Sequence, residues 1–247
     1  MTEIKSLTIE ELRQAMAALG EKPFRAGQIY KWLHEGVTSF DEMTNLSKPL
    51  REKLKTEFVL TVPELARKQV SKVDGTVKYL CVSTQAGCRM GCKFCASGLG
   101  GLKRHLSPGE ILDEILFMQR DAGERIHSLV LMGTGEPLDN YDNVLKFLQL
   151  VSSPEGLNLG QRHISLSTSG IADKIELLAK EKLQLTLSIS LHAPDNETRT
   201  SLMPVNDAFP VERLMRACRT YFETTGRRIS YEYMMAQGVT DRPWQAE

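Results

Sequence analysis

Four of the five cysteines in this 247-residue chain lie within a stretch of 15 residues. Three of them, Cys88, Cys92 and Cys95, have the spacing C-x3-C-x2-C, and Cys81 precedes them by seven residues. An odd number of cysteines in a chain without a signal peptide argues against a disulfide framework. Thiolates this close in sequence can hold one inorganic centre, so the pattern predicts a metal or iron–sulfur site.

Two kinds of centre fit this spacing. A structural zinc site normally needs four protein ligands, and Cys81 is the nearest candidate for the fourth. A [4Fe–4S] cluster held by three cysteines leaves one iron free to bind a small chelating ligand. The spacing alone leaves both interpretations open.

Further polar residues follow the predicted strands. They are Gly135 and Glu136 after the second strand, Ser167 at the end of the third, and Ser190, Leu191 and His192 at the end of the fourth. Glycine allows close approach of the backbone, and a carboxylate pairs with an ammonium group. A tight turn and a structural histidine would also explain some of these residues. Because three consecutive strands end in polar groups, we predict a ligand site at these ends.

The elements that must position these residues begin near residue 76, where strands alternate with helices as in parallel βαβ units. The predicted strands lie near residues 77–83, 127–133, 163–168, 184–191 and 228–235. They are almost continuously apolar, as buried parallel strands are. We therefore predict an α/β fold, a closed or partial (βα) barrel with its active site at the C-terminal ends of the strands. A doubly wound open sheet is the structural alternative.

Residues 1–70 predict a small all-helical domain, and residues 71–247 the barrel. The helices of the N-terminal domain are expected from the Thr8 cap to Gly20, over 25–36 and over 47–58. In the barrel, a further helix is expected to begin at a cap formed by Ser107. The third helix carries basic residues between Lys48 and Lys55, either a solvated face or part of an RNA-binding surface. The acid-free stretch between Asp74 and Glu110 is a second candidate basic patch.

Composition excludes several classes of protein. Hydrophobic residues make up 41% and charged residues 25% of the chain, and 31 basic residues balance 31 acidic ones. These values are typical of a globular protein and give no global charge for binding nucleic acid. No apolar run is long enough to span a membrane and no secretory signal opens the chain, so we expect a cytoplasmic protein without membrane association.

A strand, a C-x3-C-x2-C loop with an aromatic residue before the last cysteine, and a capped helix together resemble the radical S-adenosylmethionine (radical SAM) superfamily. The segments CVSTQAGCRMGCKFC, LMGTGEPLDNYDNV, RHISLSTSG and SISLHAP resemble one family within it, the dual-specificity adenine C2-methyltransferases of 23S ribosomal RNA and tRNA. The resemblance covers nearly the whole chain. It implies a [4Fe–4S] cluster rather than zinc, SAM as cofactor, and a partial barrel with a small helical RNA-binding domain.

The resemblance also implies roles for individual residues. Cys88, Cys92 and Cys95 would ligate the cluster, and Cys81 would be the cysteine that resolves a protein–RNA adduct. Gly135 and Glu136 would bind the amino group of SAM, and the other SAM contacts would come from Ser167, Ser190, Leu191 and His192. Cys218 lies in the middle of a predicted helix, and we interpret it as a buried structural thiol.

Adenine C2 is not nucleophilic, so polar methyl transfer from a sulfonium fails there. In the family, a radical derived from SAM activates a methyl group already carried on a C-terminal cysteine, and the cofactor supplies this chemistry. The resemblance thus implies 23S rRNA and tRNA as substrates, a flavodoxin-like external electron donor, and a monomeric enzyme.

Two departures from the family pattern affect the expected activity. The chain ends before the methyl-carrying cysteine, the sixth strand and a SAM-binding asparagine. In addition, Lys78-Tyr79-Leu80 runs directly into Cys81, where the family has a hairpin with a proton-accepting glutamate. We therefore expect a fragment that binds the cluster and cleaves SAM slowly without methylating adenine C2.

Three alternatives remain open. One is the adenine C8-methylating relative in the same family, and another is a radical SAM enzyme that acts on a small molecule. The third is a non-catalytic iron–sulfur or RNA-binding fragment. The helical N-terminal module favours an RNA substrate, because a small substrate gives no reason for it.

Overall fold

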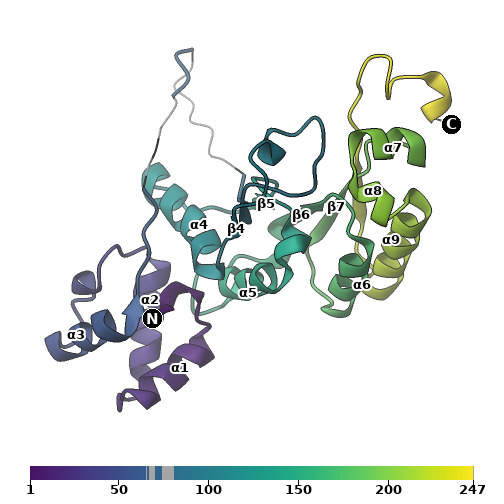
Figure 1. Ribbon diagram of the computed structural model, residues 1–247. Coiled ribbons are helices and arrows are strands. Elements are labelled where there is room, and N and C mark those ends of the chain that lie inside the picture. Colours follow the sequence, from purple (N-terminus) through teal and green to yellow (C-terminus); the bar gives the residue numbers. More distant parts are fainter. Residues whose placement is uncertain (65, 67–69, 74–80, 247) are drawn as a thin grey trace. The chain divides into compact units, whose positions relative to one another are not determined.

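The computed structural model describes residues 1–64, 66, 70–73 and 81–246 and divides into two compact units (Figure 1). The first comprises Met1–Leu80, Ser107–His127 and Asp142–Leu159, and the second Cys81–Leu106, Ser128–Tyr141 and Gly160–Glu247. The chain therefore crosses from one unit to the other several times. The predicted boundary near residue 70 stays a prediction.

The first unit begins with three short helices, as predicted: α1 (Ile9–Ala18), α2 (Phe24–His34) and α3 (Lys48–Glu57). Thr8 forms a capping box with Glu11 at the start of α1, and the Ser47 hydroxyl accepts from the Leu50 amide at the start of α3. A two-residue parallel pairing of β1 (Thr2–Glu3) with β2 (Phe58–Val59) joins the two ends of this segment. The helical prediction for the N-terminal segment is confirmed, with this short pairing as an addition.

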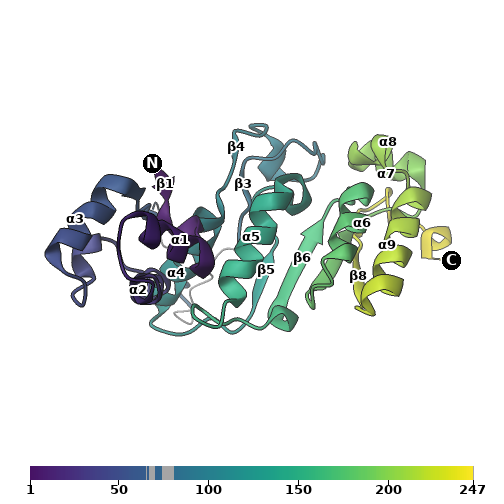
Figure 2. The same cartoon turned by 90° about the horizontal axis from the view of Figure 1, so that it is seen from below.

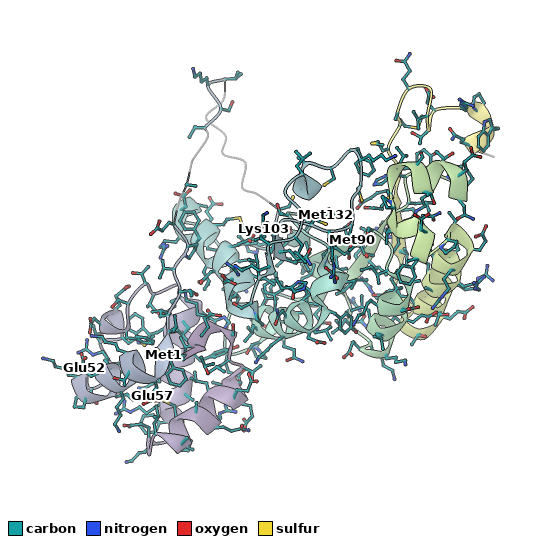
Figure 3. All side chains as sticks on the ribbon, viewed as in Figure 1. Met1, Glu52, Glu57, Met90, Lys103 and Met132 are labelled. Carbon is teal, nitrogen blue, oxygen red and sulfur yellow. The ribbon has the colours of Figure 1, made fainter. Side chains whose placement is uncertain are left out.

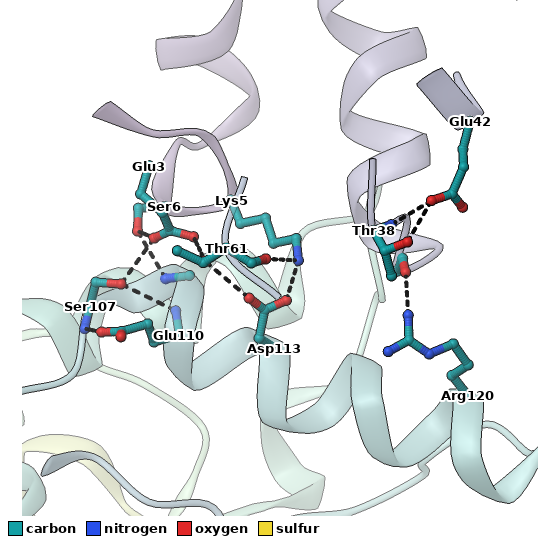
Figure 4. Close-up of polar contacts among 12 residues, drawn as sticks. Glu3, Lys5, Ser6, Thr38, Glu42, Thr61, Ser107, Glu110, Asp113 and Arg120 are labelled. Atoms are coloured by element: carbon teal, nitrogen blue, oxygen red, sulfur yellow. Dashed lines mark hydrogen bonds and ion pairs between the residues drawn. The ribbon is translucent and has the colours of Figure 1, made fainter. Parts of the chain in front are cut away.

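The same unit contains α4 (Pro108–Ala122) and most of α5 (Tyr141–Ser152). The predicted cap of α4 is present, because Ser107 and Glu110 form a capping box. Figure 4 shows how the N-terminal segment is bonded to α4: Lys5 pairs with Asp113, and Lys5 Nζ also donates to the Thr61 carbonyl at 2.8 Å. Both members of the ion pair are only 3% exposed.

The second unit is built on a parallel sheet with the strand order β5 (Leu129–Leu131), β6 (Ile164–Thr168), β7 (Thr186–Ser190) and β8 (Ile229–Glu232). All four strands lie within predicted ranges. Each strand pairs with the next one in the sequence, whereas a doubly wound sheet reverses its strand order in the middle. The sheet is therefore of the barrel type, and the doubly wound alternative is wrong.

Two helices of the second unit, α6 (Ala172–Lys180) and α9 (Val211–Thr225), pack against each other (Figures 1 and 2). Right-handed crossovers between consecutive parallel strands place such helices on one face of the sheet. Leu166, Leu187 and Ile189 on the strands are fully buried, as are Ile175 and Leu214 on the helices. Two shorter helices, α7 (Asn196–Leu202) and α8 (Val205–Ala208), follow β7.

The first predicted strand, 77–83, lies partly outside the described residues. Its described residues, 81–83, form no strand, but the backbone of this segment is bonded to β5 and to the loop after β5. The Val82 amide donates to the Val130 carbonyl at 3.1 Å, and the Thr84 amide to the Thr134 carbonyl at 3.0 Å. This segment therefore runs alongside β5 in the same direction.

Short pairings and 3-10 turns complete the fold. The antiparallel pair β3 (Gln85–Ala86) and β4 (Arg104–His105) belongs to the second unit. The 3-10 turns are Ile4–Ser6, Phe40–Glu42, Ala96–Gly98, Pro137–Asn140, Gln161–His163 and Pro243–Ala246. Within the described residues, none of the helices has the length and apolar composition needed to cross a membrane.

Candidate functional site

The three motif cysteines lie on a loop closed at its base by β3 and β4. Gly87 begins this loop at φ +80°, and a Cβ there would lie 2.0 Å from the Gly101 carbonyl oxygen. Any other residue would therefore push the two ends of the loop apart. A second tie comes from the Lys93 amide, which donates to the Leu202 carbonyl at the end of α7 at 2.9 Å.

The loop and the C-terminal ends of β5, β6, β7 and β8 line an open cavity of about 200 Å³. Most of the predicted site residues line it together: Cys88, Cys92, Cys95, Gly135, Glu136, Ser167, Ser190 and His192. Met90 and Met132, both labelled in Figure 3, add apolar surface to its wall. The cysteine loop and the polar strand ends thus meet as the sequence predicted.

Glu136 is the buried anion of the cavity, with 3% of its surface exposed. Its carboxylate accepts from the Leu138 amide at 2.9 Å and from the Ser169 amide at 2.7 Å. Burial raises its pKa, and these hydrogen bonds act in the opposite direction. Within the described part of the chain it has no cationic partner, so a positively charged ligand group would complete it.

Gly135 brings the backbone close to Gln85 and so fixes the position of Glu136. Its φ is +110°, and a Cβ would lie 2.6 Å from the Cβ of Gln85. The Glu136 amide donates to Gln85 Oε1 at 2.8 Å, while Gln85 Nε2 donates to Asp139 at 2.8 Å. Asp139 also pairs with Arg89 of the cysteine loop. This chain of contacts connects the carboxylate to the motif.

A second carboxylate, Glu232 at the end of β8, lies between two serines. The Ser190 hydroxyl donates to its Oε2 at 3.1 Å, and the Ser167 hydroxyl to the same oxygen at 3.3 Å. Parallel pairing of β6, β7 and β8 places the three side chains at neighbouring strand ends. Together they form a group of hydrogen-bonding oxygens in one wall of the cavity.

His192 adopts a left-handed backbone conformation with φ +60°. The Met234 amide donates to its Nδ1 at 3.1 Å, and its ring meets the ring of Phe94 edge to face at 5.1 Å. Burial lowers the pKa of His192, which favours the neutral imidazole. The histidine thus joins the strand end to the aromatic residue of the cysteine loop.

The three motif thiols line one cavity, as the ligands of a cluster would. Within the described residues, no three side chains of the metal-binding types converge closely enough to hold one metal ion. A cluster gives each thiolate its own iron, so its ligands stand further apart. Burial raises the pKa of Cys92 to about 11, and the neighbouring thiols Cys88 and Cys95 add to this. A bound cationic centre would remove this cost of forming thiolates.

Three candidates lie outside the cavity wall. Cys81 is partly exposed and its side chain does not line the cavity. Leu191 contributes through its backbone amide, which donates to the Glu232 carbonyl at 3.1 Å. Cys218 is 1% exposed on α9, as predicted, and burial raises its pKa to about 11. Such a thiol is inert at neutral pH.

Several cavity residues were not predicted from the sequence. Glu232 stands in a segment interpreted only as a strand, and the one available signal was a carboxylate among apolar neighbours. Phe94 was used only as part of the motif, and Met203 had no distinguishing signal. All three line the cavity.

Two family models match the chain. The ribosomal RNA large subunit methyltransferase N-terminal domain matches residues 2–60, and the radical SAM superfamily matches residues 82–246. A radical SAM methyltransferase from Sphaerobacter thermophilus, whose crystal structure is known, has 36% sequence identity and a TM-score of 0.92. The match covers 100% of this chain and 80% of that one.

Curated relatives named probable dual-specificity RNA methyltransferase RlmN are similar over almost the whole chain. The one from Geobacillus kaustophilus is 50% identical over 273 residues, covering 100% of this chain and 74% of the relative. The one from Lachnoclostridium phytofermentans is 49% identical, covering 97% of this chain and 74% of the relative. The first match is longer than the 247 residues of this chain, so that relative contains inserted residues within the matched region. The chain therefore belongs to the RlmN family of dual-specificity RNA methyltransferases, within the radical SAM superfamily.

Proposed function

We propose that this chain is an RNA methyltransferase that binds a [4Fe–4S] cluster and SAM and directs radical chemistry at an adenine carbon. The observation that carries the proposal is the single cavity lined by three motif thiols, the buried carboxylate of Glu136 and the hydroxyl groups of two strand ends. A thiol set for iron, an anion for an ammonium group and acceptors for hydroxyl groups are what a bound cluster with SAM requires.

Cys88, Cys92 and Cys95 would hold the cluster, which, when bound, supplies the electron that cleaves SAM. The protein's part is to fix the loop. Gly87 closes the base of the loop, and the Lys93 amide ties its middle to α7. These contacts limit the positions that the three thiols can take.

Glu136 would bind the ammonium group of SAM, with Gly135 allowing the backbone to approach. A carboxylate already oriented by two backbone amides loses little freedom when it accepts a third donor. The ribose hydroxyl groups of SAM would donate hydrogen bonds to Ser167, Ser190 and Glu232. Carboxylates commonly accept hydrogen bonds from the hydroxyl groups of a nucleoside. His192 and the backbone of Leu191 would hold this wall in place.

Cys81 would act as the resolving cysteine for the RNA adduct. Its partial exposure supports access to a large substrate. The modified atom would be adenine C2, as the motif resemblance implies, with C8 as the alternative. Methylation at either carbon needs the same radical centre, so the cavity does not favour one of them.

RNA would be the substrate class, 23S rRNA and tRNA in particular. The match of residues 2–60 to a ribosomal RNA methyltransferase domain supports this, as do the names of the relatives. The basic helix α3 gives weaker support than expected. Lys53 pairs with Glu21, and Lys55 pairs with Asp41 and Glu52, so part of its charge is offset locally.

The family resemblance also implies an electron donor, an oligomeric state, a compartment and an RNA-binding domain. A flavodoxin-like protein would donate the electron, the enzyme would act as a monomer, and the compartment would be the cytoplasm. The N-terminal helical segment, residues 1–70, would be the RNA-binding domain. Each of these follows from the family resemblance and needs its own test.

The deciding experiment is anaerobic reconstitution with iron and sulfide, followed by incubation with SAM, a reductant and 23S rRNA or tRNA. Mass spectrometry then measures 5′-deoxyadenosine, 2-methyladenosine and 8-methyladenosine. We expect about four irons per chain and SAM cleavage in the wild type, with neither in Cys92→Ala. Cys218→Ala is the matched control, because this thiol lies outside the cavity. Cleavage without any RNA product, accelerated by a small metabolite, would favour the small-molecule alternative.

A further inference from the structure

Arg199 on α7 is fully buried, with 0% of its surface exposed. Its guanidinium donates only to neutral oxygen atoms: the carbonyls of Ser169 at 2.6 Å, Leu191 at 3.1 Å and Ser190 at 3.3 Å, and Asn206 Oδ1 at 3.1 Å. Arginine stays protonated in proteins. The fold therefore encloses a full positive charge.

No carboxylate is bonded to Arg199 in the part of the chain that the structure describes. Four oxygen dipoles can replace lost water, but they do not neutralise the charge. Burial without a counter-charge is costly unless an anion is close. A neutral side chain would serve the packing alone at lower cost, so the charge itself needs an explanation.

The position of Arg199 supplies one. Ser169 and Ser190, which accept its hydrogen bonds, line the cavity, as does Met203 one turn further along the chain. The Met203 amide donates to the Arg199 carbonyl at 2.7 Å, and the neighbouring Leu202 carbonyl accepts from Lys93 of the cysteine loop. Arg199 is thus bonded to two residues that line the same cavity as the three thiols, and its charge interacts with Cys92.

The cavity itself contains anionic groups but no cationic side chain. Glu136 and Glu232 are its carboxylates, and none of its lining residues is lysine or arginine. His192 is held toward the neutral form by burial. Arg89 on the cysteine loop is already paired with Asp139. Once the three thiols become thiolates, the site gains negative charge that none of the lining side chains balances.

We propose that Arg199 is a positioning residue that balances the negative charge of the thiolate-bound cluster and thereby raises its reduction potential. This rests on the proposed function, because it requires a cluster at the three cysteines. The reduction potential of an iron–sulfur cluster depends on the net charge and the solvent exposure around it. A fixed cation in a poorly solvated interior stabilises the more negative, reduced form. Being enclosed, Arg199 acts through this field and through the strand ends, without touching SAM.

The test compares a neutral and a charged replacement. Arg199→Gln removes the charge and keeps hydrogen-bond donors, whereas Arg199→Lys keeps the charge and loses the fork of donors. The readout is the midpoint potential of the reconstituted cluster, measured by a redox titration followed by electron paramagnetic resonance. We expect a lower potential for Arg199→Gln and a value near wild type for Arg199→Lys. Arg213→Gln, which removes a half-buried charge on α9 that is paired with Glu176 and Asp173, is the matched control and should leave the potential unchanged.

A second variant retains the arginine and neutralises it. Asn206 Oδ1 accepts from Arg199 Nη1, so Asn206→Asp places a carboxylate on the guanidinium without changing side-chain size. The potential should fall as it does for Arg199→Gln. This variant decides the matter if Arg199→Gln does not assemble a cluster.

Several results would overturn the proposal. Equal shifts for the Gln and Lys variants would mean that the donor geometry matters and the charge does not. If Arg199→Gln and Asn206→Asp both assemble a cluster and both keep the wild-type potential, Arg199 has a purely structural role. The same holds if Arg199→Gln does not assemble a cluster and Asn206→Asp keeps the wild-type potential. A wild-type chain that never shows a [4Fe–4S] signal would refute the proposed function instead, which separates the two failures.

Discussion

The two units differ in whether their buried charges are paired. In the first unit, Lys5 and Asp113 are buried together and bonded to each other. In the second, Arg199 and Glu136 are each buried without an oppositely charged partner among the described residues. A charge paired within the fold can serve structure alone. A charge left unpaired beside a cavity indicates that a ligand completes it.

Removal of a cluster ligand should have the largest effect. In Cys92→Ala, two thiolates remain and the cavity loses part of its ligand set, so the iron content should fall from about four per chain to below one. Iron and sulfide assays after anaerobic reconstitution measure this. Full iron content in Cys92→Ala would mean that the thiols do not form the centre, and the contrast between the units would then lose its basis.

Breaking the buried pair in the first unit should be the next largest effect. Lys5→Met leaves the carboxylate of Asp113 buried alone and should cost about 3–5 kcal/mol. Burial raises the pKa of Asp113 to about 6 despite the nearby lysine. The attraction between the two charges therefore does not exceed the cost of removing the carboxylate from water, and the pair adds little to the free energy of unfolding. Lys5→Met/Asp113→Leu should therefore recover most of the loss.

Urea unfolding followed by the fluorescence of Trp32 on α2, in a Trp244→Phe background, measures this in the first unit. Lys53→Met is the matched control, because its pair with Glu21 is exposed and should be worth less than about 1 kcal/mol. If the double variant is as unstable as Lys5→Met, the pair contributes more than the comparison allows.

His34 should make the stability of the first unit depend on pH. It is 7% exposed on α2, and burial lowers its pKa to about 4, whereas an unfolded histidine titrates near 6.5. Its depressed pKa means that stability is fully present above about pH 6.5 and falls as the pH drops toward 4, by about 3 kcal/mol in total. His34→Gln should flatten this decline.

Urea midpoints measured from pH 7 to pH 4 provide the comparison. His163→Gln, at an exposed position, is the control and should follow the wild type. A variant of His34 that loses stability as steeply as the wild type would assign the acid sensitivity to other groups.

Glu136→Gln should show the smallest of these effects while testing the second unit most directly. The amide removes the charge expected to pair with the ammonium group, which should weaken SAM binding about ten- to a hundredfold. Isothermal titration calorimetry on the reconstituted protein measures it. Glu176→Gln on the outer helix α6 should bind as the wild type does. Unchanged affinity in Glu136→Gln would mean that the buried carboxylate has another partner.

The sequence predicted the parts of the fold that repeat a local pattern. The cysteine spacing, the polar strand ends, the Ser107 capping box and four parallel strands all follow from residues close together in the chain. Arg199 was not predicted, because NETRTSL has the composition of an exposed polar helix and nothing local indicates that its arginine is enclosed. Glu232 was missed for a related reason: its serine partners lie on two other strands. Sites assembled across strands depend on register, which no single segment encodes.

His192 combines three demands in one residue. Its backbone must adopt φ +60°, its side chain must accept a hydrogen bond from the Met234 amide, and its ring must meet the ring of Phe94 edge to face. Glycine meets the first demand, asparagine meets the first two, and phenylalanine meets only the third. Few substitutions could therefore be fixed at this position without a compensating change elsewhere. Descendant lineages should exchange Leu191 freely long before they exchange the histidine beside it.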